Sequence, residues 1–260
     1  MASNDRSVLV EYPFSGVLVL RLNRPAKRNA LSNAVISELA AAIRQAEQQK
    51  GCRCIVIAGH ETFFSAGADI MEMKDRGIAA IQNRTRTENW SVLETTRIPM
   101  IAAVSGICFG GGHELAMLCD IVLASATATF AQPEIKLGHI PGDGATQRLP
   151  RRVGKYAAMQ MILTGEPIGA EQALRMGLVA EVTPPEMLET RALDVAQLIA
   201  RHSAPVLGLA KDAVRAAEEL CLSAGLERER RNIALAFNTN DQKEGLAAFF
   251  DKRPAIFRDE

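Results

Sequence analysis

The sequence lacks an excess of charge of either sign. Its 260 residues include 30 Lys and Arg and 30 Asp and Glu, so the formal net charge at pH 7 is zero. Proteins that bind nucleic acid usually carry a basic surplus, and so do segments that bind anionic membrane surfaces. The charge balance therefore argues against both kinds of partner. A chain of this length can bury a core without disulfides or structural metals.

Stretches that could cross a bilayer or direct secretion are also missing. The most apolar one, residues 98–112, is too short for a membrane span and is interrupted by Pro99 and Ser105. The first ten residues contain Asp5 and Arg6 and no apolar centre, unlike a secretory signal. We therefore expect a cytoplasmic protein that does not enter a membrane.

Cysteine and histidine are scarce, and neither shows the spacing of a metal site. The five cysteines form no CxxC pair, and an odd number of them favours reduced thiols over a disulfide framework. Cys52 and Cys54 flank Arg53, which fits alternation along a strand better than metal binding. The four histidines are scattered along the chain without the spacing of metal ligands. We expect no bound metal.

The motifs of several large enzyme classes are absent. The chain has no GxSxG elbow and no GxxxxGK[ST] loop, which argues against an α/β-hydrolase and against a P-loop nucleotide site. Gly142-Asp143-Gly144 begins like a dinucleotide-binding fingerprint, but Gln147 stands where the third glycine belongs. A dinucleotide cofactor is therefore not expected.

What the sequence does contain is an alternation of short apolar runs with helical patterns. After residue 186 no convincing strand occurs, and the amphipathic composition predicts helices only. This pattern predicts an α/β fold of loosely repeated strand–strand–helix units, residues 1–195, followed by a helical oligomerisation segment, residues 196–260. The expected strands are 8–12, 17–22, 54–58, 98–104, 121–124 and 178–182, and the expected helices are 32–50, one opening near 69, 112–119, one after 155, and one ending at 177.

Three segments combine glycines with carboxylates at strand-to-helix turns. They are 64–70, 110–115, and 132–134 followed by 140–142. Glycines at such a turn let the backbone approach a ligand closely, and free N–H groups at a helix N-terminus favour negative charge. Two such turns could direct two N–H donors at one oxygen, which is an oxyanion hole. Asp69 is placed to cap the helix that follows the first turn.

Two glutamates belong to these segments. Glu114 is in the first turn of its helix, and Glu134 follows 20 residues later in a loop that an intervening strand could return to the helix. Two carboxylates in one pocket suit general acid/base catalysis, because burial and repulsion can leave one protonated. Each feature also has a plain structural explanation: packing for the glycines, the helix dipole for Glu114, and a surface loop for Glu134. The occurrence of all three segments in this order favours an active site.

Together these residues resemble the crotonase superfamily, the enoyl-CoA hydratase/isomerase family. The resemblance implies a spiral of strand–strand–helix turns with a C-terminal helical trimerisation segment, assembled as a homotrimer or a dimer of trimers. It covers nearly the whole chain. The matching stretches are 22–25 with 29–31, 64–72, 101–120, 130–149, 153–155 with 163–165, and 244–245 with 248–249 and 252–253.

The resemblance also implies roles for particular residues. The N–H groups of Ala68 and Gly111 bind the thioester oxygen, Glu114 and Glu134 act as the catalytic carboxylates, and the N–H of Gly142 helps hold the water. Further substrate contacts are implied for Ala66, Asp69, Ile70 and Lys27, and for Phe249 and Lys252, which reach the coenzyme A of a neighbouring subunit.

Three residues depart from the family pattern. His113 stands where hydratases often have a small residue, and Asp143 adds a third carboxylate where relatives often have alanine. Met71 replaces a frequent lysine, for which Lys74, Lys27 or Arg28 could substitute.

The function implied by the resemblance is an enoyl-CoA hydratase, which adds water across the 2,3 double bond of a 2-enoyl-CoA to give a 3-hydroxyacyl-CoA. No cofactor is implied, because coenzyme A is part of the substrate. Trp90 and residues 98–104 resemble hydratases of phenylacetate catabolism that act on dehydroadipyl-CoA; fatty-acid catabolism is the other setting. Alternatives are an enoyl-CoA isomerase, a dehalogenase-like crotonase, or a non-catalytic protein that binds acyl-CoA or RNA.

Overall fold

The computed structural model describes residues 6–49 and 51–260. Residues 1–5, the first half of the N-terminal stretch that is unlike a secretory signal, lie outside the described residues. The described chain begins with a hairpin of β1 (Val8–Phe14) and β2 (Val17–Leu22), which pair antiparallel. Gly16 in the turn has a φ of 80°, a conformation that glycine adopts without strain. The hairpin confirms the first two predicted strands.

The larger of two sheets has six strands in the order β1-β2-β3-β5-β7-β10, and all pairs after the hairpin are parallel. Its central strands are apolar on both faces, which is typical of a parallel sheet covered on both sides. The further strands of this sheet are β3 (Cys54–Ala58), β5 (Met100–Val104), β7 (Ile121–Ser125) and β10 (Glu181–Thr183).

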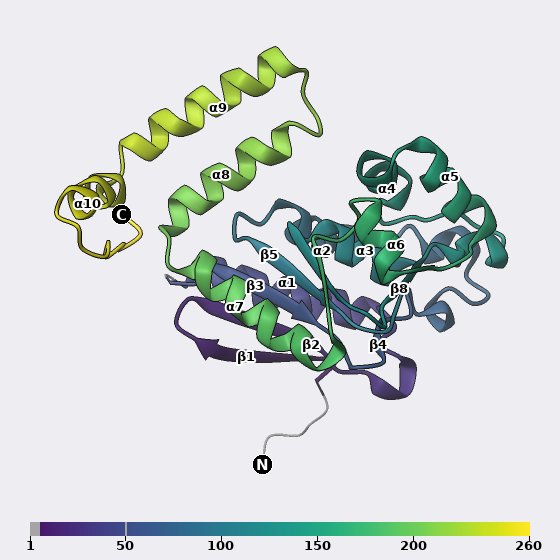
Figure 1. Cartoon of the computed structure of the whole chain (residues 1–260). Coiled ribbons are helices and arrows are strands. Elements are labelled where there is room, and N and C mark those ends of the chain that lie inside the picture. The colour runs from purple at the N-terminus through teal and green to yellow at the C-terminus, as the bar shows by residue number, and fades with distance from the viewer. Residues whose placement is uncertain (1–5, 50) are drawn as a thin grey trace.

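Helices cover both faces of this sheet (Figure 1). On one face, Leu18 and Ile57 share the main core with α1 (Asn33–Gln48), whose apolar positions recur with the period of a helix. On the other face, Val19 and Val56 pack against α7 (Leu188–Ala200), which presents a row of alanines. The sheet therefore forms the middle layer of the body.

A second sheet consists of four short strands that alternate along the chain with strands of the main sheet. Each of β3, β5 and β7 is followed by one short strand and then by helical structure, and this repeat confirms the predicted strand–strand–helix spiral. The short strands are β4 (Phe63–Ser65), β6 (Ile107–Phe109), β8 (Thr129–Ala131) and β9 (Ile168–Gly169). The helices of the body are η1 (Pro25–Lys27), η2 (Ile70–Glu72), η3 (Gly77–Ala80), α2 (Arg84–Thr95), α3 (Gly111–Leu118), η4 (Pro133–Leu137), α4 (Ala145–Val153), α5 (Lys155–Thr164), α6 (Ala170–Arg175) and η5 (Pro185–Met187).

Two predicted elements differ from the structure. The helix expected near Asp69 is the single 3-10 turn η2, although the Asp69 carboxylate does cap it by accepting from the Met71 N–H at 3.3 Å. The strand expected over 178–182 begins only at Glu181. The reason is that the Leu178 N–H donates to the Ala173 carbonyl and so caps the end of α6 instead of pairing with a strand.

Between residues 186 and 250 the chain forms helices and no strand, as predicted. After α7 come α8 (Ala204–Ala216), α9 (Leu222–Phe237) and α10 (Asn240–Phe250), which stand out from the body as a C-terminal arm, residues 204–260 (Figure 1). Lys211 ties α8 to the body through Asp120 at 2.8 Å, and Asp259 returns to Arg53 at 3.1 Å. The predicted boundary at residues 195/196 lies inside α7, and the division into two units stays a prediction.

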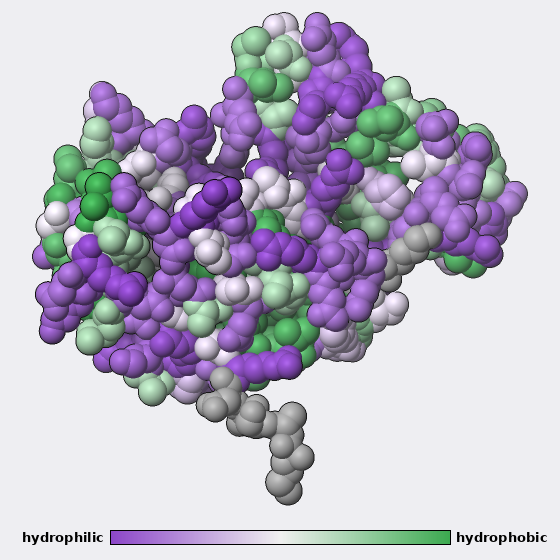
Figure 2. All heavy atoms as spheres, turned by 180° about the vertical axis from the view of Figure 1, so that it is seen from behind, coloured by the Kyte–Doolittle hydropathy of each residue, from purple (hydrophilic) through white to green (hydrophobic). Residues whose placement is uncertain are grey.

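The arm exposes large apolar side chains that it does not bury within its own chain. Figure 2 shows hydrophobic residues among hydrophilic ones on its surface. The exposed apolar residues of the arm include Val214, Leu222, Ile233, Phe237, Phe249 and Phe250. In the part of the chain that the structure describes, no helix combines the length and the hydropathy needed to span a bilayer.

Candidate active site

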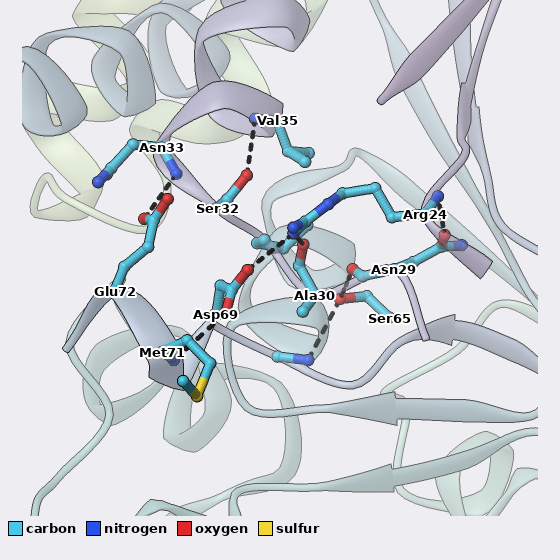
Figure 3. A network of polar contacts seen from close by, with 12 residues as sticks. Arg24, Asn29, Ala30, Ser32, Asn33, Val35, Ser65, Asp69, Met71 and Glu72 are labelled. Carbon is cyan, nitrogen blue, oxygen red and sulfur yellow. Dashed lines mark hydrogen bonds and ion pairs between the residues drawn. The ribbon is translucent and has the colours of Figure 1, made fainter. Parts of the chain in front are cut away.

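The turn that follows β4 is shaped by a network of buried polar contacts (Figure 3). Asn29, in the left-handed conformation with a φ of 55°, accepts from the Arg24 N–H at 2.8 Å and donates to the Phe64 carbonyl at 3.1 Å. The Ser65 hydroxyl donates to the Asn29 carbonyl at 2.8 Å and accepts from the Gly67 N–H at 3.2 Å. These contacts fix the path of the backbone from residue 65 to residue 68.

The same turn is joined to the segment before α1. Leu31 donates to the Gly67 carbonyl at 2.7 Å and accepts from the Asp69 N–H at 3.3 Å, so Leu31 and Ala68 form a short parallel bridge. The Arg24 guanidinium contacts the Asp69 carboxylate at 3.0 Å. The N–H of Ala68 itself has no acceptor among the described residues.

The second turn lies against the first. An ideal Cβ at Gly112 would be 2.6 Å from the Ser65 Cβ, so only glycine permits this approach. One at Gly111 would be 3.3 Å from the Ala68 nitrogen, which brings the N-terminus of α3 beside the free Ala68 N–H. Within the described chain the Gly111 N–H also has no acceptor. Two unpaired N–H groups thus lie together at the positive end of a helix, where an anionic oxygen is stabilised.

Glu114 extends from the first turn of α3 and is 2% exposed. Its Oε1 accepts from the N–H groups of Asp143 and Ala145 at 2.9 and 2.8 Å. Burial, together with the negative charges of Asp143 and Glu134, raises the pKa of Glu114 to about 7 against the lowering effect of those two donors. A carboxyl with such a pKa exchanges protons near neutral pH.

Glu134, in η4, is the second carboxylate of the site. The chain passes through β7 and β8 and returns it to the start of α3, where its Oε1 lies 2.6 Å from the position of a Cβ at Gly110. Gly110 has a φ of 50°, and its missing side chain makes room for the carboxylate. Burial raises the pKa of Glu134 above its ordinary value. The structure therefore brings together Glu114, Glu134 and the two free N–H groups.

His113 acts on Glu134 through an intervening amide. In the orientation of Gln132 that satisfies both neighbours, its oxygen accepts from the His113 Nδ1 at 3.1 Å and its nitrogen donates to both Glu134 oxygens at 3.1 Å. Complete burial lowers the pKa of His113 to about 4, so the imidazole is neutral. This departure from the family pattern thus supplies an uncharged contact that orients Gln132.

Asp143 is held by residues that the sequence analysis did not single out. Its carboxylate pairs with Arg86 at 2.7 Å, and its carbonyl accepts from Arg148 at 3.0 Å. Gly142, directly before it, is exposed, and its N–H has no acceptor among the described residues. No sequence signal identifies Arg86, because its partner lies 57 residues away.

The other predicted contacts lie at two separate places. Ala66, Ile70 and Lys27 are exposed around the first turn, whereas the Asp69 side chain is already used by Arg24 and Met71. Met71 is exposed. Phe249 in α10 and Lys252 just after it belong to the arm, on the side of the molecule away from α3 (Figure 1), so one chain does not bring them to the site.

Metal ligands do not gather at this site. Among residues 6–49 and 51–260, no group of three His, Cys, Asp or Glu side chains is placed to hold a metal ion. What the site offers instead is a pair of carboxyls with raised pKa values beside two backbone donors. That arrangement suits proton transfer at a carbon next to a carbonyl group.

Comparisons with known proteins agree with this geometry. The model of the family described as enoyl-CoA hydratase/isomerase matches residues 14–260. The chain is 46% identical to the 2,3-dehydroadipyl-CoA hydratase of Escherichia coli (strain K12) over 242 residues, 93% of this chain and 95% of that one. It is 47% identical to a probable enoyl-CoA hydratase of Rhizobium meliloti over 240 residues, 92% of this chain and 93% of that one.

Solved structures extend the agreement to three dimensions. The crystal structure of an enoyl-CoA hydratase from Bacillus anthracis superposes with a TM-score of 0.92 at 34% identity, covering 98% of this chain and 100% of that one. With the family model matched over most of its length and relatives above 40% identity over nearly all of it, the chain belongs to the enoyl-CoA hydratase/isomerase family of the crotonase superfamily.

Proposed function

We propose that this protein is an enoyl-CoA hydratase that adds water across the 2,3 double bond of a 2-enoyl-CoA and forms a 3-hydroxyacyl-CoA. The observation that carries the proposal is the pair of buried carboxylates, Glu114 and Glu134, beside the unpaired N–H groups of Ala68 and Gly111. Hydration needs both a base for the water and an acid for carbon. An isomerisation, by contrast, can proceed with a single carboxylate.

In the proposed reaction, the thioester oxygen accepts from the N–H groups of Ala68 and Gly111. The oxygen of a water molecule bonds to C3, and Glu114 takes one proton from that water. The electron pair of the 2,3 double bond passes toward the thioester oxygen, where the two N–H donors stabilise the enolate. Glu134 then delivers a proton to C2, and proton exchange between the carboxyls and solvent restores the starting state.

The raised pKa values of both glutamates support their acting as an acid–base pair. Burial favours the neutral form of each, and ionisation of Glu134 raises the pKa of Glu114, so the pair favours holding one proton between its members. The Gly142 N–H is proposed to help hold the water. The proposed steps add the oxygen of water to C3 and move protons, with no electron acceptor or donor involved, so we propose that the reaction needs no cofactor and no metal.

For the acyl group we propose a 2-enoyl-CoA of fatty-acid or aromatic-acid catabolism, with dehydroadipyl-CoA as the first candidate. The relative named for that substrate supports this choice, although relatives named only as enoyl-CoA hydratases are equally similar. Ala66, Ile70 and Lys27 surround the first turn, where coenzyme A enters in this proposal; Asp69 shapes that turn through Arg24.

We further propose that the arm assembles the protein as a homotrimer or a dimer of trimers. Support comes from its exposed apolar side chains, which in an isolated chain would face water. In this arrangement Phe249 and Lys252 contact the coenzyme A that is bound by a neighbouring subunit. The cytoplasmic location stays a prediction, and some of the relatives are named as mitochondrial proteins.

The test is a hydration assay over short, medium, aromatic and dicarboxylic 2-enoyl-CoA thioesters. The loss of the enoyl-thioester absorbance measures the rate of hydration. Glu114→Gln and Glu134→Gln should each lower the hydration kcat by roughly 10²–10⁴-fold. The double variant should lose far less than the product of the single losses, because the two carboxyls act as a unit. Retention of most activity by either single variant would refute the two-carboxylate mechanism.

The same assay separates the alternatives. Faster 3-enoyl to 2-enoyl isomerisation than hydration by the wild-type protein would favour an isomerase. Salt-dependent binding of RNA with no turnover of any acyl-CoA would favour a non-catalytic protein instead.

A further inference from the structure

One guanidinium connects the two halves of the site. Arg86 lies on α2, and its side chain is only 15% exposed. Its Nη2 contacts Asp143 Oδ2 at 2.7 Å, and its Nη1 donates to the Leu31 carbonyl at 3.4 Å. Leu31 bridges to Ala68 of the first turn, whereas Asp143 belongs to the turn that holds Glu114. The guanidinium also lies 5.8 Å from the ring centre of Trp90, which limits its freedom to move.

The turn held by Arg86 is the one that orients the proposed base. The Asp143 N–H donates to Glu114 at 2.9 Å, so any movement of residue 143 is transmitted directly to that carboxylate. The carbonyl of Asp143 is held from the other side by Arg148, which is itself paired with Glu94 at 2.7 Å. The turn therefore sits between two arginines, of which only Arg86 is paired with the Asp143 charge.

The charges around Glu114 show why that pairing matters. Glu134 faces it from η4, and Asp143 faces it from the turn; both are acidic and disfavour its ionisation. The cations are Arg86 from α2 and Arg148 from α4, of which Arg148 is neutralised by Glu94. His139 faces Glu134 and lowers the pKa of that carboxyl. His113, from α3 itself, is neutral. Arg86 is thus the cation that compensates a third carboxylate in a site whose mechanism uses two.

We propose that Arg86 is a positioning residue of this enzyme: by pairing with Asp143, it offsets the extra negative charge beside the Glu114–Glu134 pair. It also ties the turn that holds Glu114 to Leu31, which is paired with Ala68. The role rests on the proposed hydratase function. Arg86 touches neither reacting atom nor proposed substrate contact, so it acts through Asp143 and Leu31.

The test compares three variants by the pH dependence of kcat/KM. Arg86→Met leaves the Asp143 anion uncompensated, so Glu114 ionises less readily and the acidic limb should move to higher pH by about one unit. Asp143→Asn keeps the backbone N–H but leaves Arg86 uncompensated, so the limb should move to lower pH. The double variant should return the limb close to that of the wild type.

Two further variants separate charge from structure. Arg84→Met removes an arginine from the same helix whose side chain is exposed and pairs with Glu88, so it should leave the profile unchanged. Arg86→Lys keeps the charge and should restore most of the limb position. If Arg86→Met does not fold, Asp143→Asn still tests the proposal, because its acidic limb of kcat/KM should move to lower pH.

A second measurement does not depend on turnover. With glutamate labelled with carbon-13 at its carboxyl, NMR titration follows Glu114, whose resonance is assigned by its loss in Glu114→Gln. The titration should shift upward in Arg86→Met and downward in Asp143→Asn. If the wild-type protein hydrates no enoyl-CoA, the proposed function fails, while this titration still judges Arg86. A uniform loss of kcat/KM at all pH values, with no shift in either measurement, would overturn the proposal.

Discussion

Replacing Glu114 by glutamine should make the protein more stable at neutral and alkaline pH while it removes the proposed base. The Oε1 of a glutamine can still accept from the Asp143 and Ala145 N–H groups, which hold the native carboxylate at 2.9 and 2.8 Å. The turn should therefore keep its place. What the substitution removes is the cost of an ionised group that is 2% exposed.

The size of the effect follows from the pKa. A Glu114 pKa of about 7 in the folded protein, against an ordinary 4.5, means that the folded state holds its proton more tightly than the unfolded chain. The stabilisation from that proton is complete below the unfolded pKa and is lost as the pH rises through the folded value. At about 1.4 kcal/mol per pKa unit, the wild type should lose about 2.5 kcal/mol relative to Glu114→Gln between about pH 5 and about pH 8.

The assay is equilibrium denaturation of both proteins at several pH values and one fixed protein concentration, because assembly contributes to the measured free energy. Glu171→Gln, an exposed glutamate at the start of α6, should follow the wild-type pH dependence. Parallel curves for the wild type and Glu114→Gln would refute the reasoning, since they would show that Glu114 titrates alike in the folded and unfolded states.

Three further predictions concern other parts of the molecule. Gly112→Ala places a methyl group 2.6 Å from the Ser65 Cβ and should cost roughly 1–3 kcal/mol in thermal unfolding; Gly225→Ala, in open space on α9, is the control, and equal stability of the two variants would contradict the prediction. Lys252→Ala should raise KM more than it lowers kcat, and less so at high salt, because a remote contact with a phosphate acts on ground and transition states alike; an unchanged KM would remove Lys252 from the site. Truncation after Ser203 removes the arm and should give monomers or aggregates by light scattering, whereas a soluble oligomer of unchanged order would show that assembly lies elsewhere.

The parts of the fold that were predictable are those with a clear hydrophobic period. Residues 17–22, apolar except for Arg21, and residues 54–58, which are apolar throughout, form strands as expected, and the helical period before residue 50 gives α1. The strands β4, β6 and β8 have three residues each, too few to show any alternation. The polar helix α2 buries only Asn89, Trp90 and Leu93, so its sequence lacks a recognisable apolar face.

Some residues of the candidate site could be predicted from the sequence and others could not. Glu114 and the two turns around it could be selected because glycines mark those turns in the sequence, and the resemblance to the family then implied Ala68 and Gly111 as the donors. The neighbours that tune them could not, because they come from distant segments: Arg86 meets Asp143 across 57 residues, and Gln132 meets His113 across 19. Such contacts arise only when the chain is folded, and no local pattern records them.

The free N–H groups of Ala68 and Gly111 belong to the main chain, and this has a consequence for how the protein tolerates genetic change. Almost any codon substitution at residue 68 keeps the donor atom, because every residue except proline carries a backbone N–H, whereas at Gly111 a Cβ would lie 3.3 Å from the Ala68 nitrogen. A one-residue insertion or deletion between 65 and 68 is different, since it slides the donor out of register with α3. We therefore expect residue 68 to tolerate substitutions but the loop around it not to tolerate changes in length. Replacing one amide by an ester through chemical synthesis would remove a single N–H donor without moving the chain.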